Sequence, residues 1–195
     1  MNTEIIHHVH LAVKKRKSIV SFSGQEIEDE DLRLLFEAAR WAPSSYNQQP
    51  WRFIIAKKEE REEFQTFVDL LSEGNRSWAP SAPVLVLSLA EVVNEYNNKI
   101  NRFAFHDLGI AVGNLLFQAT SMGLGVHLMG GYDVEKAKTV LNIPDNFEPA
   151  AMMAIGYQGE IDHLPVELKR RELAKRTRKE VDEIVYTAKW GRGLW

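Results

Sequence analysis

Two basic clusters near opposite ends of the chain contain residue types that bind phosphate. They consist of Arg16, Lys17 and Ser18, and of Lys175, Arg176 and Arg178. Guanidinium, ammonium and hydroxyl groups hold a phosphate by charge-assisted hydrogen bonds. Taken alone, each cluster is more often a solvated basic surface, and the first lies where cations complement the C-terminal end of a helix. An anion site is therefore a hypothesis that needs support from other segments.

A polar loop between two tryptophans, residues 41–51 (WAPSSYNQQPW), is the second chemical feature. Two hydroxyls and three amides lie between prolines and aromatic residues. This mixture suits a flat ring system with carbonyl and imide edges. The structural alternative is a turn in which Ser44 or Ser45 satisfies a helix end, although the three amides would then have no role.

The glycine-rich stretch GLGVHLMGG at residues 123–131 could suggest a dinucleotide cradle. It follows an expected helix rather than a strand and lacks the GxGxxG spacing, so we do not predict a Rossmann fold. Gly123 is typical of a helix C-cap. For Gly130 and Gly131, a tight bend and the close approach of a ligand to backbone N–H groups are both open.

Two groups of histidines are interpreted as packed or solvated side chains rather than as metal-binding or catalytic residues. One short amphipathic helix cannot direct His7, His8 and His10 at a single metal ion, and no carboxylate cluster supports them. His106 beside Asp107 resembles a general base with an orienting partner, but neighbouring residues on a helix are expected to point apart. We therefore predict neither a metal site nor a working His–Asp pair.

Composition excludes several classes of protein. A chain of 195 residues with 45% hydrophobic content predicts one compact domain over residues 1–195. A formal charge of -3 gives no field that would collect nucleic acid or anionic lipid. Because cysteine is absent, redox chemistry would need a bound organic cofactor or a His/carboxylate metal site. The N-terminus lacks the order of a secretory signal and the apolar run at 82–90 is too short to span a bilayer, which favours a cytoplasmic protein.

Apolar periodicity predicts the elements that position these segments. Helices are expected over residues 4–15, 28–42, 59–72, 103–122 and 134–141, and strands over 51–57, 82–90 and 150–158, with a short extended piece at 125–131. The run at 82–90 belongs in the middle of a sheet. Residues 91–102 are amide-rich and expected to be mobile, and residues 166–178 form a basic polar tail. This interleaving predicts an α+β fold with helices around a small sheet.

Together the segments resemble the nitroreductase family of FMN-dependent oxidoreductases. The matching pieces run in family order over nearly the whole chain: RKSIVSF at 16–22, EAARWAPSSYNQQPWRF at 37–53, DLGIAVGNLLFQATSMGLG at 107–125, GGY at 130–132, AIGY at 154–157 and KRTRKEVDEIV at 175–185. The APSSYNQQPW segment is the specific signal among them. The resemblance implies a nitroreductase-like α/β/α sandwich with a small, mainly antiparallel sheet, assembled as an intertwined homodimer with two FMN molecules between the subunits.

The same resemblance implies which residues hold FMN. The phosphate would be held by Arg16, Ser18, Arg176 and Arg178, with Lys17 beside them. The partner subunit would supply Pro43, Ser44, Ser45 and Asn47 to the isoalloxazine and ribityl chain. Behind the ring would pass Leu128, Met129, Gly130 and Gly131, with the backbone N–H of Gly130 near flavin N5, where a fixed dipole stabilises developing charge. Family members often carry a basic residue at the position of Val20, so this chain has fewer cations for the phosphate.

The implied activity is ping-pong hydride transfer from NAD(P)H through flavin N5 to a nitroaromatic, quinone or similar flat acceptor, without a catalytic side chain. Tyr96 and Phe103 fall where the family varies its substrate wall and are candidates for acceptor selection. The C-terminal tail, about residues 179–195, would wrap the partner and bury aromatics that one domain leaves exposed. The alternative is a flavin-binding or scavenging protein, or an FMN-dependent enzyme with oxygen-linked chemistry.

Overall fold

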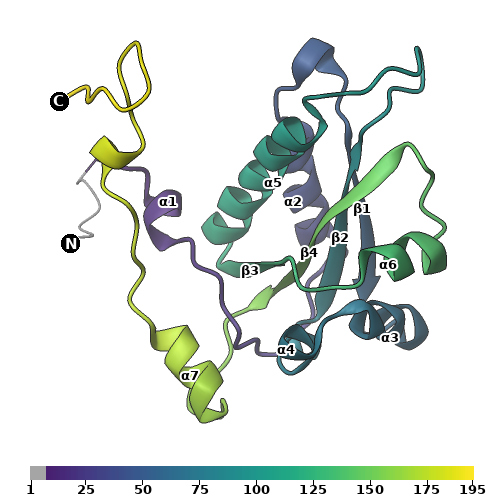
Figure 1. The fold of residues 1–195 in the computed structure, drawn as a ribbon. Coiled ribbons are helices and arrows are strands. Elements are labelled where there is room, and N and C mark those ends of the chain that lie inside the picture. Colours follow the sequence, from purple (N-terminus) through teal and green to yellow (C-terminus); the bar gives the residue numbers. More distant parts are fainter. Residues whose placement is uncertain (1–7) are drawn as a thin grey trace.

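A four-stranded antiparallel sheet forms the centre of the protein in the computed structural model, which describes residues 8–195 (Figure 1). The strands are β1 (Trp51–Lys57), β2 (Val84–Glu91), β3 (Leu124–Met129) and β4 (Phe147–Tyr157). Their order is β1-β2-β4-β3, and each neighbouring pair is antiparallel. The apolar run at 82–90 is thus a central strand, as predicted, and β2 is buried along nearly all of its length.

Helices cover both faces of this sheet. They are α1 (Leu11–Lys15), α2 (Asp29–Arg40), α3 (Arg61–Leu70), α4 (Glu73–Arg76), α5 (Ala104–Ser121), α6 (Val134–Val140) and α7 (Val166–Leu173). Because side chains alternate along a strand, Leu85 and Leu87 pack with α3 and α6, whereas Val84 and Val86 pack with α2 and α5. These two cores make the α/β/α sandwich that the sequence predicts.

The local sequence explains where α2 begins and where α5 ends. The helix α2 begins with Asp29, Glu30 and Asp31, which complement the positive end of the helix dipole. The helix α5 is followed by Gly123, whose φ of 79° is a left-handed conformation that glycine adopts without a Cβ clash. The predicted role of Gly123 in ending this helix is confirmed: it follows the C-cap residue Met122, and β3 starts directly after it.

The N-terminal helix is shorter than predicted. The expectation was residues 4–15, and the structure has α1 from Leu11 to Lys15, while residues 1–7, which include His7, lie outside the described residues. Val9 and Val13 are exposed, so no buried stripe extends the helix within the described part. His10 caps α1, because its Nδ1 accepts a hydrogen bond from the Ala12 N–H at 3.3 Å.

Two polar segments contain defined local structure. Residues 91–102 form a hairpin in which the Asn94 N–H donates to the Lys99 carbonyl at 2.9 Å and the Asn101 N–H donates to the Val92 carbonyl at 2.8 Å. The tail expected at 166–178 begins with α7. Neither segment has an apolar stripe, so the sequence pattern predicts neither the hairpin nor α7.

The segments α1 and α7 and the C-terminal tail lie to one side of the sandwich (Figure 1). The tail leaves much apolar surface in solvent, with Trp190 91% and Trp195 74% exposed. Within residues 8–195, no helix has both the length and the apolar character needed to cross a bilayer.

Candidate functional site

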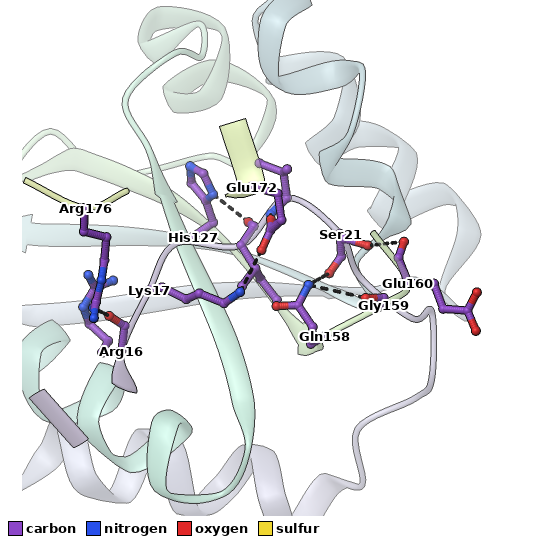
Figure 2. Close-up of polar contacts among 11 residues, drawn as sticks. Arg16, Lys17, Ser21, His127, Gln158, Gly159, Glu160, Glu172 and Arg176 are labelled. Carbon is purple, nitrogen blue, oxygen red and sulfur yellow. Dashed lines mark hydrogen bonds and ion pairs between the residues drawn. The ribbon is translucent and has the colours of Figure 1, made fainter. Parts of the chain in front are cut away.

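The two basic clusters meet in the folded chain, although about 160 residues separate them. The Arg176 guanidinium donates hydrogen bonds to the backbone carbonyls of Arg16 and Lys14, both at 2.6 Å (Figure 2). Burial lowers the pKa of Arg16, and the nearby guanidiniums of Arg176 and Arg178 lower it further. Like charges held this close repel one another, so an anion placed among them would be bound favourably.

The hydroxyl of Ser18 lies at the edge of this cluster, 3.5 Å from Nη1 of Arg16. Arg178 is exposed and its Nη1 donates to the Thr177 carbonyl at 2.6 Å. The structure therefore brings together Arg16, Ser18, Arg176 and Arg178. Lys17 takes a different direction, because its Nζ lies 3.0 Å from Oε1 of Glu172 on α7. Glu172 is a residue that the sequence analysis missed.

A buried histidine supports the first cluster from β3. His127 is 6% exposed, and its Nδ1 lies 2.7 Å from the Ile19 carbonyl, while its Nε2 lies 3.0 Å from Nη2 of Arg171. A carbonyl only accepts and a guanidinium only donates, so Nδ1 carries the proton of a neutral imidazole. Burial lowers the pKa of His127; the bond to Ile19 opposes this shift and the charge of Arg171 adds to it. A Cβ at Gly125 would collide with Ile19, so glycine there allows the close packing.

The polar loop is held in a strained conformation. Its backbone has positive φ at Tyr46 (51°), Asn47 (55°) and Gln49 (50°), values that cost energy for residues with a side chain. The Ser44 Oγ accepts a hydrogen bond from the Gln49 N–H at 3.0 Å and closes the loop. The Ser45 N–H donates to Oδ2 of Asp107 at 2.8 Å. Neither serine side chain caps the short helix Ser45–Asn47, so helix capping does not explain them.

The expectation that His106 and Asp107 point apart is wrong. Nδ1 of His106 lies 2.9 Å from Oδ1 of Asp107, whose side chain is 4% exposed. Both residues lie in the first turn of α5, and the exposed His106 ring turns toward the carboxylate of its neighbour. Asp107 thus anchors the polar loop through the Ser45 N–H, while its other oxygen contacts His106.

The two candidates for acceptor selection lie around the same loop. The hydroxyl of Tyr96 accepts a hydrogen bond from Nε2 of Gln48 at 3.1 Å. The ring of Phe103 packs edge-on against His106, with 6.5 Å between the ring centroids. Tyr96 and Phe103 are both largely accessible, at 73% and 40% exposed. The structure therefore groups the hairpin, the loop and the start of α5.

The end of β3 presents backbone rather than side chains. Met129 is buried in the core, whereas Leu128 is 37% exposed. Gly130 is exposed, and a Cβ there would meet nothing within 4 Å. Gly131 packs against α4: its carbonyl accepts hydrogen bonds from the Ser72 N–H and from Nδ2 of Asn75, each at 3.0 Å. Hydrogen bonds from Ser72 and Asn75 thus hold the bend at Gly131, while the backbone at Gly130 is exposed to solvent.

The site segments are not all adjacent within one chain. The polar loop between α2 and β1 is tied to the start of α5, whereas the bend at 130–131 follows β3 and is tied to α4. The strands β1 and β3 form opposite edges of the sheet (Figure 1). Two surface hollows of about 480 and 670 Å³ are lined by other residues, around Lys57 and along α2. Within the described residues, no group of three side chains could hold a metal ion.

Comparison with known proteins identifies the family. The nitroreductase family model matches residues 13–71 and 65–157. A crystal structure described as that of "the oxidoreductase containing FMN" superposes with a TM-score of 0.90 at 32% identity, over 97% of this chain and 96% of that one.

Two curated relatives are similar in sequence. An uncharacterized 15.4 kDa protein of Mycolicibacterium smegmatis is 31% identical over 73% of this chain and 99% of its own length. A protein of Methanothermobacter thermautotrophicus, provisionally named NADH dehydrogenase/NAD(P)H nitroreductase, is 29% identical over 76% of both chains. The chain is an oxidoreductase that belongs to the nitroreductase family.

Proposed function

We propose that this protein binds FMN at a homodimer interface and uses NAD(P)H to reduce flat acceptors such as nitroaromatics and quinones. The observation that carries the proposal is the convergence of the Arg16, Arg176 and Arg178 guanidiniums at one place. Family membership and similarity to an oxidoreductase containing FMN support flavin as the cofactor. The name of the Methanothermobacter thermautotrophicus relative supports NAD(P)H as the reductant.

The residues present fit FMN. Three guanidiniums supply positive charge and donors for the oxygens of a phosphate monoester. Burial lowers the pKa of Arg16, and the charges of Arg176 and Arg178 lower it further, as expected where cations are held close together. The strained loop at 43–49 supplies amides and hydroxyls for the polar edges of the ring, and Gly130 leaves its backbone open to a ligand.

A second copy of the chain completes the site in this proposal. The polar loop and the arginine cluster lie apart in one chain, so a ligand that contacts both requires two subunits. Large apolar side chains are exposed on the same chain, with Leu11 at 57%, Phe105 at 52% and Ile184 at 61%. Such surface marks an interface, and the tail at 179–195 would lie on the partner.

FMN, when bound, supplies reversible hydride transfer. The chain itself contributes binding and orientation. Arg16, Arg176 and Arg178 would hold the phosphate, and the loop anchored by Asp107 would orient the polar edges of the ring. The open backbone at Gly130 would offer a fixed N–H dipole. No buried acid or base is required, and Tyr96 and Phe103 would border the acceptor.

Anaerobic mixing of the FMN-loaded protein with NADH or NADPH tests the proposal. We expect at least one of the two to bleach the flavin absorbance, and a quinone added next to restore it. A flavin that neither nicotinamide reduces would reject the reductase and favour a flavin-binding protein. Reoxidation by oxygen alone, with no response to quinones or nitroaromatics, would favour oxygen-linked chemistry.

A further inference from the structure

A buried carboxylate lies beside the arginine cluster. The Glu172 side chain is 1% exposed and makes two contacts with the N-terminal segment at residues 16–20 (Figure 2). Its Oε1 lies 3.0 Å from Nζ of Lys17, and its Oε2 accepts a hydrogen bond from the Val20 N–H at 2.6 Å. Both partners are more than 150 residues away in the chain, so the contacts join distant segments.

Glu172 lies where the two basic clusters are joined. It is at the end of α7, four residues before Arg176, whose guanidinium donates to carbonyls of the N-terminal segment. The preceding residue, Arg171, donates to Nε2 of His127 and lies over the Trp78 ring, 5.7 Å from its centroid. The end of α7 is therefore fixed to β3 on one side and to residues 16–20 on the other.

The negative charge of the Glu172 carboxylate does not favour the binding of a phosphate nearby. A negative charge near a bound phosphate opposes it, and Glu172 also holds Lys17 in an ion pair. Burial of the Glu172 carboxylate costs desolvation energy that its attraction to the half-exposed Lys17 does not always repay. A carboxylate in this place therefore needs a role other than electrostatic attraction of the ligand.

We propose that Glu172 is a positioning residue for the phosphate site, on the premise of the FMN site proposed above. It holds residues 16–20 by Lys17 and the Val20 N–H, and it thereby sets Arg16 and Ser18 against Arg176 and Arg178. Lys17 serves as the partner of Glu172 rather than as a phosphate ligand. Positioning and charge predict opposite effects, because removal of the carboxylate weakens phosphate binding if it positions the cluster and strengthens it if only charge matters.

Flavin fluorescence titrations with FMN and with riboflavin, which lacks the phosphate, separate these effects. For Glu172→Ala we expect FMN affinity to fall by about tenfold or more, the scale of a lost charged hydrogen bond, and riboflavin affinity to stay within about twofold of the unmodified protein. Glu172→Gln keeps one acceptor and should lose less. The matched control is Glu167→Gln, which removes an exposed carboxylate from the same helix and should change neither affinity.

Two results of the titrations would overturn the inference. One is FMN affinity that is unchanged or higher in both Glu172 variants. The other is an equal loss of FMN and riboflavin affinity, which indicates general destabilisation. If Glu172→Ala does not fold, the Glu172→Gln protein gives the same comparison.

Hydrogen exchange on the flavin-free protein tests positioning independently of FMN. We expect Glu172→Gln to accelerate exchange at residues 16–20 and 174–178 and to leave β2 and β4 unchanged. Unaltered exchange at both segments would contradict the positioning role. If the unmodified protein binds no FMN, the proposed function fails, and the exchange result alone decides whether Glu172 orders the two segments.

Discussion

The carboxylate of Asp107 accepts a hydrogen bond from the backbone N–H of Ser45, with 2.8 Å between Oδ2 and the nitrogen. The other oxygen of this carboxylate pairs with Nδ1 of His106 at 2.9 Å. One buried acid on α5 thus holds a loop 62 residues earlier in the chain. Because the loop contains three residues with positive φ, it depends on such anchors to keep its conformation.

Asp107→Ala should loosen this loop. The substitution leaves the Ser45 N–H without its charged acceptor, so the free energy of unfolding should fall by roughly 1 to 3 kcal/mol. FMN affinity should fall as well. Denaturant unfolding and FMN titration measure the two effects. The control is His106→Gln, which removes a side chain that is 68% exposed and should cost little. An Asp107→Ala protein as stable as the original would refute the anchoring role.

The two serines of the loop should respond differently to substitution. Ser44→Ala removes the acceptor for the Gln49 N–H, so the flavin-free protein should lose about 1 kcal/mol of stability. Ser45 is anchored through its backbone, so Ser45→Ala should leave that stability unchanged and alter flavin affinity or redox potential instead. Melting of flavin-free and flavin-loaded proteins distinguishes them. A large drop in melting temperature for flavin-free Ser45→Ala would assign its hydroxyl a structural role.

Arg16→Ala and Arg178→Ala should each weaken FMN binding by about tenfold or more, since a charged hydrogen bond contributes roughly 1.5 to 3 kcal/mol. Riboflavin, without a phosphate, should bind these variants as it binds the unmodified protein. Lys179→Ala serves as the control for loss of a nearby exposed cation. Fluorescence titration gives all of these constants. Unchanged FMN affinity in both arginine variants would remove the assignment of the phosphate site.

Stability should depend on pH through His127. The pKa of His127 in the folded protein lies below the ordinary value of 6.5. Between these two pKa values His127 is protonated in the unfolded chain and neutral in the folded one. The free energy of unfolding should therefore fall as pH drops below about 6.5 and level off only below the folded-state pKa. His127→Gln should reduce this slope by up to about 1.4 kcal/mol per pH unit. His163→Gln, at a histidine 83% exposed, should leave the slope unchanged. Equal slopes in all three proteins would contradict this account.

If the protein is the proposed homodimer, removal of residues 179–195 should shift it toward monomer and weaken FMN binding, while Arg176 and Arg178 remain in the chain. The reason is the exposed apolar surface of this tail, including Trp190 and Trp195. Sedimentation velocity at matched concentrations measures the assembly. A shortened chain that still sediments as a dimer would show that the tail is not the main contact.

The sandwich was predictable because its core segments carry strong local patterns. The apolar run at 82–90 identified a central strand, and the glycine after residues 103–122 marked the end of a helix, without knowledge of any partner. Hydrogen bonds between distant residues leave no such pattern. The helix α7 has no buried apolar residue, and its position depends on Arg171 and Glu172 reaching β3 and residues 16–20.

The site was predictable in part for the same reason. The types of residue in the basic clusters and the loop were visible in the sequence, and the structure brings Arg16, Ser18, Arg176 and Arg178 together. The direction of Lys17 was not visible, because it depends on a carboxylate 155 residues later. Ideal helix geometry predicts that His106 and Asp107 point apart, and it does not account for the rotation of the exposed His106 ring toward the carboxylate.

The most direct test of the central claim is a crystal structure of the protein grown with FMN. We predict an FMN phosphate within hydrogen-bond distance of the Arg16 and Arg178 guanidiniums, with the ring between residues 128–131 of one subunit and the polar loop at 43–47 of the other. An FMN phosphate bound elsewhere, or crystals without FMN at saturating concentration, would contradict the account.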